Sequence, residues 1–480
     1  MGRRMLRPYT CKVAVRSKKI DAIPGHSQYS PEPIRMKHLL HCAVTMFAAL
    51  LVSAAAGAQA RPLPGPDVQK IYDRLLPQIE KIPLYDNHAH PGFGDDSDVD
   101  AMAAVPGETD FMRTRADNPE FITAAKQMLD YPYSDFSSEH MKWLADKSKA
   151  AEAAGDTKYF DSILDKLNTE TVLANRAMMA PYLDPKRFHW VFFVDSFFYP
   201  FDNSERTAST PDMGVYIPLQ EKMLSRYKKL EGVEGLPADL AGYEDFVRRT
   251  MTDNVEKRGG VAMKFEAAYF RSLYFTDPPR ATAEAIYAKY RAAGVPSPGE
   301  YNIFQDYIFR VLINQAGKLH IATHIHSAVG IGDYFSLNNG KVMNLENVLR
   351  DPRYKDQTFV LLHGGWPYYK EAALFTAVKN VYLDTSFQSE FLYPSQFKEV
   401  LKQLLTLFPE KMMYASDAFP FNEALGAEES FWLSARSTRT ALAAALAELV
   451  SEGAYTEPKA MELAHMYLHD NAAKLYGGTK

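Results

Sequence analysis

The chain has 480 residues, with 54 Lys and Arg against 59 Asp and Glu, and a formal net charge of −5 at pH 7. Residues 1–60 hold 9 of the basic and 2 of the acidic residues, so residues 61–480 carry 45 against 57, a charge of −12. Such an acidic surface argues against nucleic acid or an anionic membrane as a partner.

The first 60 residues resemble a secretory leader. An apolar run, Ala43–Ala56, is followed by the small-residue cleavage site Ala58-Gln-Ala60, and the run is too short to cross a bilayer. We therefore expect residues 1–60 to be a leader with a signal peptide at about 36–60. The mature protein would then be secreted or periplasmic, begin near Arg61 and contain no membrane span; the alternative is a membrane anchor.

Beyond the leader, strand-like runs recur with helical stretches between them. The expected strands are Ile82–His90, Thr169–Ala174, His189–Asp195, Gly260–Glu266, Leu319–His326, Thr358–His363, Val381–Ser386 and Lys411–Asp417. The clearest helices are Asp67–Lys81, Glu300–Ala316, Tyr368–Lys379, Pro394–Phe408, Ala427–Gly453 and Glu457–Gly477. Strands alternating with helices imply a parallel sheet. Eight such units predict an α/β fold, a (β/α)8 TIM barrel that forms a single domain over residues 61–480.

Two connections are longer than a barrel requires. Residues 92–168 follow the first strand and show helical spacing over Glu120–Leu129, Glu139–Ala151 and Tyr159–Leu167, and residues 197–259 follow the third strand. Loops after barrel strands form the active-site face. We therefore expect helical insertions after strands 1 and 3 that build a lid over the site.

The first strand ends in the pair His88 and His90. Alternate side chains of a strand share one face, so both imidazoles point the same way at its carboxyl end. That geometry suits two ligands on one metal ion.

Other strands end in the same kind of residue. They carry Lys264 in the fourth strand, His324 and His326 in the fifth, His363 in the sixth and Asp417 in the eighth. Barrels hold their active sites at this end. Both cysteines, Cys11 and Cys42, lie in the predicted leader, so the ligands are imidazoles and carboxylates. This donor set favours zinc, with manganese or iron as alternatives.

Six motifs occur together along the chain. They are Asp86-Asn-His88-Ala-His90, Lys264 with Ala268-Tyr-Phe-Arg271-Ser-Leu273, His326-Ser-Ala-Val-Gly-Ile-Gly-Asp333, His363-Gly-Gly, Ala415-Ser-Asp417 and Asn471-Ala-Ala-Lys-Leu-Tyr-Gly477. With them the chain resembles the metal-dependent amidohydrolase superfamily, in its amidohydrolase-related branch, over roughly Ile82 to Gly477. The resemblance implies one or two divalent ions, bound by His88, His90, the fifth-strand histidine and Asp417. It also implies that His363 is a catalytic residue, as ligand of a second ion or as a substrate contact.

Three assignments stay open at this point. His324 and His326 are two residues apart, so they lie on the same face of the fifth strand, and the Ser-Ala-Val-Gly stretch that follows favours His326 as the ligand. Lys264 is either a carboxylated bridge between two metals or, as we favour, a lysine that binds a substrate carboxylate. Arg271 either pairs bidentately with an anionic substrate or forms a structural ion pair with Glu266 or Asp333, and the same ion pair is an alternative for Lys264.

The expected function is hydrolysis of an amide, ester or lactone bond in a small, anionic organic molecule by metal-activated water. A metal lowers the pKa of water towards neutrality, and Asp417 would take the proton and pass it to the leaving group. The alternative on the same scaffold is decarboxylation or isomerisation of a carboxylic acid. A different class, a catalytically silent metal-binding barrel, would lack a ligand. The expected partner is the substrate, with a homo-oligomer left open.

Overall fold

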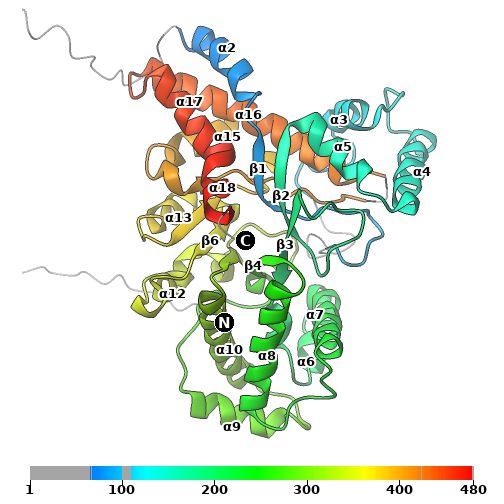
Figure 1. The fold of residues 1–480 in the computed structure, drawn as a ribbon, viewed down its shortest axis with the longest axis vertical. Coiled ribbons are helices and arrows are strands. Elements are labelled where there is room, and N and C mark those ends of the chain that lie inside the picture. The colour runs from blue at the N-terminus through cyan, green and yellow to red at the C-terminus, as the bar shows by residue number, and fades with distance from the viewer. Residues whose placement is uncertain (1–64, 66, 100–109, 423, 478–480) are drawn as a thin grey trace, which may run out of the picture. The chain divides into compact units, whose positions relative to one another are not determined.

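Eight parallel strands, each hydrogen-bonded to its neighbour in the sequence, form the centre of the protein (Figure 1). The computed structural model describes residues 65, 67–99, 110–422 and 424–477, so the predicted leader lies outside the described residues. The strands are β1 Leu84–Ala89, β2 Thr169–Asn175, β3 Phe188–Phe193, β4 Gly260–Phe265, β5 Ala322–His326, β6 Phe359–Leu362, β7 Val381–Asp384 and β8 Met412–Met413. They form a nearly closed barrel, which confirms the predicted (β/α)8 fold class.

The barrel closes between β1 and the segment that follows β8. Asn87 donates its backbone N–H to the carbonyl of Tyr414 (3.1 Å), and Asp417 donates to the carbonyl of His88 (2.7 Å). His90 continues this series by donating to the carbonyl of Ala418 (2.7 Å). These bonds replace a regular β8–β1 ladder, and they bring Asp417 beside the two histidines of the first strand.

Helices surround the strands. Before β4 they are α2 Val68–Ile79, α3 Pro119–Leu129, α4 Ser138–Ala154, α5 Lys158–Leu167, α6 Ser204–Thr207, α7 Pro211–Leu230 and α8 Leu240–Glu256. Between β4 and β7 they are α9 Arg280–Tyr290, α10 Pro298–Leu319, α11 Leu337–Gly340, α12 Glu346–Leu349 and α13 Tyr369–Phe375. After β7 they are α14 Gln388–Phe391, α15 Pro394–Leu404, α16 Ala427–Ser451, α17 Glu457–His465 and α18 Asn471–Tyr476.

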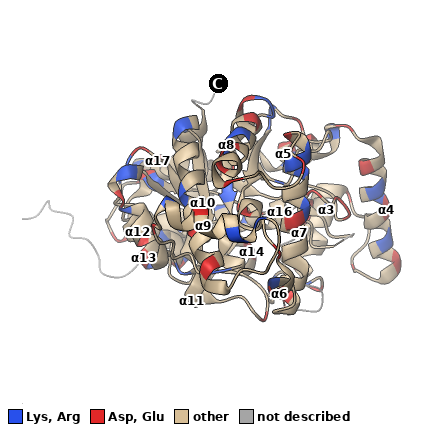
Figure 2. Ribbon diagram, turned by 90° about the horizontal axis from the view of Figure 1, so that it is seen from below, with Lys and Arg blue, Asp and Glu red and all other residues tan. Residues whose placement is uncertain are grey.

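The two long connections contain helices that are additional to the barrel layer. Helices α3, α4 and α5 lie between β1 and β2 and group on one side of the barrel, whereas α6, α7 and α8 lie between β3 and β4 (Figure 1). Only Leu144 is buried in α4, and charges of both signs are interspersed along this helix (Figure 2). Mixed charge is what a largely solvated helix requires. No helix is assigned in the link from β2 to β3, so the expected alternation fails at this one connection.

The lower part of the barrel is filled by side chains and closed by the last helix. Inward-facing residues from most strands, among them Leu173, Val191, Val360 and Met413, form one buried cluster with Ala472 and Tyr476 of α18. Filling by layers of side chains makes a TIM barrel a solid core. The open space therefore lies at the opposite end, where the strands finish.

The long helix predicted over Glu457–Gly477 is interrupted. Helix α17 ends at His465, a π-helical turn covers Met466–Asp470, and α18 follows. Within this turn the carbonyl of Tyr467 accepts the N–H of Tyr414 (2.8 Å) from the segment after β8. A carbonyl diverted from the helical ladder causes a local kink, and this contact is invisible to periodicity.

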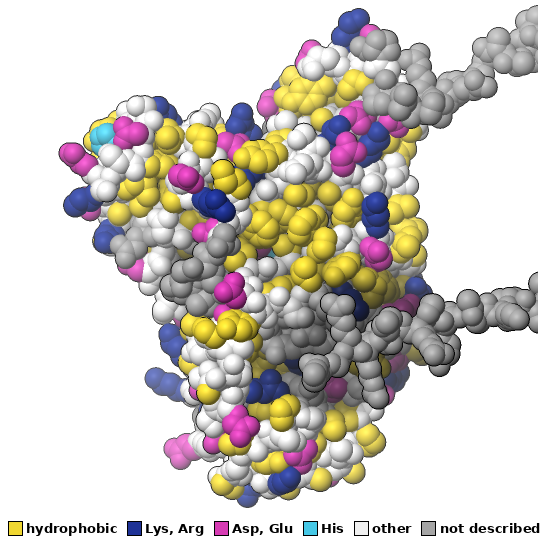
Figure 3. Space-filling view, turned by 180° about the vertical axis from the view of Figure 1, so that it is seen from behind, with side chains coloured by type: hydrophobic (Ala, Val, Ile, Leu, Met, Phe, Trp, Pro, Cys, Tyr) yellow, Lys and Arg dark blue, Asp and Glu magenta, His cyan; other side chains and the backbone are white. Residues whose placement is uncertain are grey.

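Among the described helices, none combines the length and apolar character needed to span a bilayer. Hydrophobic side chains gather across the centre of the face shown in Figure 3. A contiguous apolar surface of this kind can bind a second copy of a chain. The homo-oligomer stays a prediction.

Candidate metal centre

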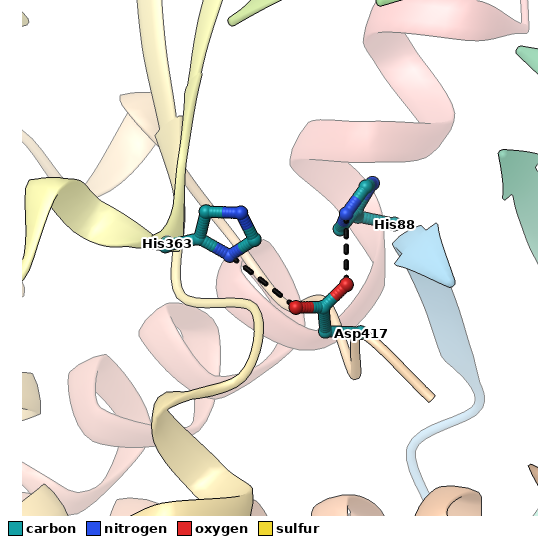
Figure 4. A group of neighbouring side chains, drawn as sticks. All are labelled: His88, His363 and Asp417. Atoms are coloured by element: carbon teal, nitrogen blue, oxygen red, sulfur yellow. Dashed lines mark ion pairs between the residues drawn. The ribbon is translucent and has the colours of Figure 1, made fainter. Parts of the chain in front are cut away.

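Asp417 lies between the histidines that end β1 and follow β6. Its Oδ1 atom is 2.9 Å from His88 Nε2 and 3.4 Å from His90 Nε2. Its Oδ2 atom is 3.5 Å from His363 Nδ1, and Figure 4 shows the carboxylate pointing between the rings of His88 and His363. The possible ligand atoms of His88, His363 and Asp417 all lie within 4.8 Å of one another. The fold thus brings together residues from the first, sixth and eighth strand regions.

Asp86 holds the two chain segments of this cluster together. Its carboxylate accepts the N–H of Ser416 (2.9 Å), the hydroxyl of Ser416 (2.5 Å) and the N–H of His88 (3.2 Å). Asp86 is buried, and burial raises its pKa to about 7. The bonds to Ser416 and His88 fix Asp417 next to the first strand.

His363 is oriented by a second buried carboxylate. Asp384, the last residue of β7, accepts the N–H of His363 (3.0 Å) and the hydroxyl of Ser386 (2.7 Å). The Ser386 Oγ atom is 2.9 Å from His363 Nδ1. Outer partners of this kind fix the orientation of metal-ligating imidazoles.

The two histidines of β5 lie in different layers of the barrel. The Nδ1 atom of His326 is 2.9 Å from His363 Nε2, and its Nε2 atom is 3.0 Å from the carbonyl oxygen of Val329. His324 lies deeper, with Nε2 2.7 Å from the hydroxyl of Tyr476 on α18. His326 is therefore the fifth-strand histidine at the cluster. It stays a predicted ligand, because its ring would have to turn to direct a nitrogen at a shared ion.

Lys264 lies at the centre of the cluster and is 1% exposed. Its Nζ atom is 3.2 Å from His88 Nε2, 3.4 Å from His90 Nε2 and 3.2 Å from Glu266 Oε1. The ammonium thus contacts the two imidazole nitrogens that the sequence predicts as metal ligands. Since an ammonium beside a divalent cation is repelled, Lys264 must turn away or be carboxylated when a metal binds.

The protonation states match those of metal ligands. Burial lowers the pKa of His88 and His326 well below the usual range of histidine, and lowers the pKa of His363 to about 4. Burial by itself would raise the pKa of Asp417, but the adjacent imidazoles of His88 and His363 hold it well below its ordinary value. Metal binding requires neutral imidazoles and an ionised carboxylate, and both are favoured here.

The backbone is strained around the cluster. Eight non-glycine residues of the described chain have a positive φ, and three of them, Asp130, Asn168 and His320, end helices, where this is common. The other five lie at the carboxyl ends of the last strands: Ala328, Val329, His363, Phe387 and Asp417. Such strain costs roughly 1–3 kcal/mol per residue and concentrates at functional sites.

A cavity opens over these side chains, with about 490 Å³ of empty space, open solvent included. The polar residues of its lining are His90, Lys264, Glu266, His326, His363 and Asp417. The apolar and aromatic ones are Tyr269, Val329, Ile331, Phe387 and Phe419. The lining of the site therefore combines charged and apolar side chains.

Arg271 is not among the residues that line this cavity. Its Nη2 atom is 2.5 Å from Asp306 Oδ1, and its Nη1 atom is 3.2 Å from Gln305 Oε1, both on α10. The guanidinium is thus occupied in anchoring the loop after β4. The ion-pair partner shown by the structure, Asp306, differs from Glu266 and Asp333, the partners suggested by the sequence.

The residues fit a divalent ion. The separations of 2.9 Å and 3.4 Å between Asp417 and the two first-strand imidazoles resemble those of ligands sharing a zinc, which follow from bonds of about 2.0–2.2 Å. Imidazoles and one carboxylate form the donor set, and no thiolate takes part among the described residues.

Several residues that build this site escaped the sequence reasoning. Asp384 lies two residues before the end of the predicted strand Val381–Ser386 and is the last residue of β7, so the search of strand ends that found Asp417 could have found it. Asp195 follows the third strand and accepts the N–H of Glu266 (2.8 Å), a structural role. Looking for acidic residues at the ends of predicted strands therefore finds both site residues and acids with a structural role. Phe193, whose ring stacks on His90 with centroids 6.3 Å apart, carried no signal.

Comparison with known proteins agrees with this picture. Residues 314–478 match the sequence model of the amidohydrolase family. Protein fluG of Emericella nidulans is 29% identical over 154 residues, which are 32% of this chain and 17% of that protein. The chain thus spans less than a fifth of the length of that relative.

Solved structures resemble most of the chain. Glucuronate isomerase from Caulobacter crescentus has a TM-score of 0.59 and 12% identity, covering 88% of this chain and 97% of its own. Uronate isomerase from Thermotoga maritima has a TM-score of 0.55 and 12% identity, covering 86% and 99%. A Lactobacillus casei protein, provisionally assigned as a metal-dependent hydrolase, has a TM-score of 0.52 and 16% identity, covering 84% and 97%. At such identities the likeness concerns the fold. The chain is a TIM barrel, and its residues 314–478 match the amidohydrolase family.

Proposed function

We propose that the protein is a metal-dependent hydrolase that cleaves an amide, ester or lactone bond in a small organic substrate. The observation that carries this proposal is the ionised Asp417 carboxylate, 2.9 Å from His88 and 3.4 Å from His90, in the lining of an open cavity. A carboxylate in contact with neutral imidazoles at the carboxyl ends of barrel strands is suited to hold a metal and to move a proton.

His88, His90 and Asp417 would hold one divalent ion, with zinc as the first candidate and His326 as the predicted fourth ligand. His363, 3.5 Å from Asp417 Oδ2, would complete this shell or bind a second ion. The chemistry that a divalent ion supplies when bound is polarisation of the substrate carbonyl and a lowered pKa for water.

Asp417 is the proposed proton carrier. Its pKa lies well below the ordinary value, so the carboxylate is ionised at neutral pH and can act only as a weak base. It would hold that proton at Oδ2, on the side of His363, and release it to the leaving group. Phe387 and Phe419 line the cavity beside it and would exclude bulk water from the reacting bond.

Lys264 would supply the positive charge for an anionic substrate. Its ammonium lines the cavity and is balanced by Glu266 at 3.2 Å. A substrate carboxylate that replaced Glu266 beside Lys264 would leave the net charge around the ammonium unchanged. A carboxylated lysine would be negatively charged and would repel that carboxylate, so the proposal favours an uncarboxylated lysine.

The test is a zinc-reconstituted preparation assayed against amides, esters and lactones of small carboxylic acids. We expect turnover that chelation abolishes, and that Asp417→Asn reduces by at least about 100-fold because it removes the proton carrier. The matched control is Asp161→Asn, an acid on α5 outside the cavity lining, which should keep wild-type turnover. Zinc-independent turnover would refute the proposal.

The second candidate is isomerisation or decarboxylation of a carboxylic acid. Lys264 and Glu266 place a second proton-transfer pair on the cavity wall, which isomerisation requires and simple hydrolysis does not. Release of carbon dioxide, or a product of unchanged mass, would identify this reaction in the same assay. Release of an amine or alcohol identifies the hydrolase.

A further inference from the structure

A second cavity adjoins the metal centre on the side of the inserted helix α7. Its empty space is about 550 Å³, open solvent included. Glu266 lines both cavities, and Phe193, which lines the second, stacks on His90 with ring planes 11° apart. The second cavity therefore adjoins the cluster at Glu266 and at Phe193. We call the second space the distal cavity.

The lining of the distal cavity mixes apolar residues with polar and charged ones, and its apolar residues come from separate segments of the chain. Phe193 comes from β3, Leu219 and Met223 come from α7, and Val99 comes from the loop after β1. The two long connections of the barrel thus meet here. An apolar chain that left water for this space would gain about 0.8 kcal/mol per buried methylene.

Lys222 and Gln220 give the lining of the distal cavity two groups that can bind an anion. Arg226 is paired with Asp98, Nη1 to Oδ1 2.6 Å, so its charge is balanced. No ion pair is recorded between Lys222, which is exposed on the same helix, and any described acid. The amide of Gln220 is 7% exposed, and its Oε1 lacks a hydrogen-bond partner within the described chain. A 180° rotation of the Gln220 side-chain amide exchanges its oxygen and nitrogen, so that its NH2 group can donate to a carboxylate in the cavity.

We propose that the distal cavity binds the part of the substrate that is not cleaved, an aliphatic arm ending in a carboxylate that pairs with Lys222 and Gln220. This inference rests on the proposed metal centre, which holds the reacting end. It adds helix α7 to Lys264 as a second place of anion recognition and takes no contribution from Arg271, which Asp306 occupies. Leu219 and Met223 then select for the length of the arm.

Hydroxamates, which bind zinc through a fixed head group, test this with the zinc-loaded full chain. Isothermal titration calorimetry gives the Kd of acetohydroxamate, hexanohydroxamate and adipic monohydroxamate. We expect hexanohydroxamate to bind at least about 10-fold tighter than acetohydroxamate, because its chain enters the distal cavity. We expect adipic monohydroxamate to bind about 3-fold tighter again through its carboxylate.

Three variants separate the two contributions. Leu219→Trp narrows the cavity at a half-buried position that tolerates a larger side chain. It should reduce the ratio of the Kd of acetohydroxamate to that of hexanohydroxamate, the chain-length ratio, to below about 2-fold. Lys222→Met should abolish the difference in Kd between hexanohydroxamate and adipic monohydroxamate and keep the chain-length ratio. Lys229→Met, at an exposed position of the same helix outside the cavity lining, is the control and should keep both the ratio and the difference.

The outcomes are distinct. Zinc-dependent binding of all three hydroxamates with equal Kd values would overturn the distal cavity and leave the metal centre intact. A chain-length gain that survives Leu219→Trp would also overturn it. Binding of acetohydroxamate that is independent of zinc would overturn the metal centre, and the distal cavity with it.

Discussion

Removing the hydroxyl of Tyr476 tests how the last helix supports the metal centre. The hydroxyl donates to Asn87 Oδ1 (2.8 Å) and accepts from His324 Nε2 (2.7 Å). Asn87 in turn donates to Asp384 Oδ2 (2.7 Å), the carboxylate that also binds the N–H of His363. The substitution Tyr476→Phe therefore removes one oxygen atom from a network that joins α18 to the strands bearing the predicted ligands.

The size of the effect follows from burial. Tyr476 is 4% exposed, and both Asn87 and His324 are 0% exposed. Each partner that loses its hydrogen bond is left buried and unsatisfied, at a cost of about 1–3 kcal/mol. We expect Tyr476→Phe to lower the free energy of unfolding by about 2–4 kcal/mol, the sum for two partners after partial relaxation. Loss of an outer support typically weakens metal binding about 10–100-fold.

Urea unfolding of the metal-free protein gives the first quantity, and competition for zinc with a chelator gives the second. The control is Tyr382→Phe in β7, a half-buried tyrosine with no hydroxyl hydrogen bond recorded among the described residues. It should change stability by less than about 0.5 kcal/mol. If Tyr476→Phe behaves like this control in both measurements, the network does not support the site, and the reasoning is refuted.

Four further predictions follow from the site and the leader. His90→Ala should reduce zinc affinity by more than the roughly 10–100-fold that an outer partner contributes, with the circular dichroism of the barrel unchanged; full zinc binding would remove His90 from the ligand set. Lys264→Ala should keep one equivalent of metal while KM rises steeply, measured by elemental analysis and kinetics; loss of a second equivalent would show a carboxylated bridge instead. Burial raises the pKa of Glu390 well above its usual value, and its Oε1 accepts the hydroxyl of Ser430 (2.6 Å). Because the pKa of Glu390 is higher in the folded state than the unfolded value of 4.5, the folded protein loses stability as the pH rises above 4.5 and the buried side chain must ionise. Glu390→Gln removes this cost, so its effect on the free energy of unfolding should be more favourable at pH 8 than at pH 4.5 by at least about 1 kcal/mol. Equal effects at both pH values in urea titrations would contradict this. Sequencing the amino terminus of protein from the native host should find a start near Arg61, and a mature chain that keeps residues 36–60 would exclude export with cleavage.

The strands could be predicted because apolar runs bounded by turn residues carry their own signal. The fourth strand, expected at Gly260–Glu266, is found at Gly260–Phe265, and the seventh, expected at Val381–Ser386, at Val381–Asp384. Tertiary contacts were not predictable in this way. The π-helical turn at Met466–Asp470 depends on a carbonyl bonded to a distant strand segment, and helical spacing does not record that bond.

The candidate site shows the same division. Strand parity placed His88 and His90 together and could not rank His324 against His326, because both face the barrel interior. Depth decides between them: His326 lies at the last residue of β5, whereas His324 lies one layer lower beside Tyr476. The position of Arg271 depends on Asp306, a residue of α10 that pairs with it only after the loop folds back.

The end of the eighth strand shows why the most important residue of the site is also the least regular. The sequence predicts a strand over Lys411–Asp417, but β8 is only Met412–Met413. The chain leaves the ladder after Met413, where the N–H of Tyr414 bonds to the carbonyl of Tyr467. Asp417 then adopts a φ of 65°, which costs roughly 1–3 kcal/mol for a residue that is not glycine. A regular strand would place every second side chain on the barrel axis, and the turn at Asp417 instead directs its carboxylate at His88 and His363. The bonds of Asp86 to Ser416 and His88 hold this turn in place. Periodicity predicts the regular strand that carries the chain to the site, and the departure from it brings the carboxylate to the histidines.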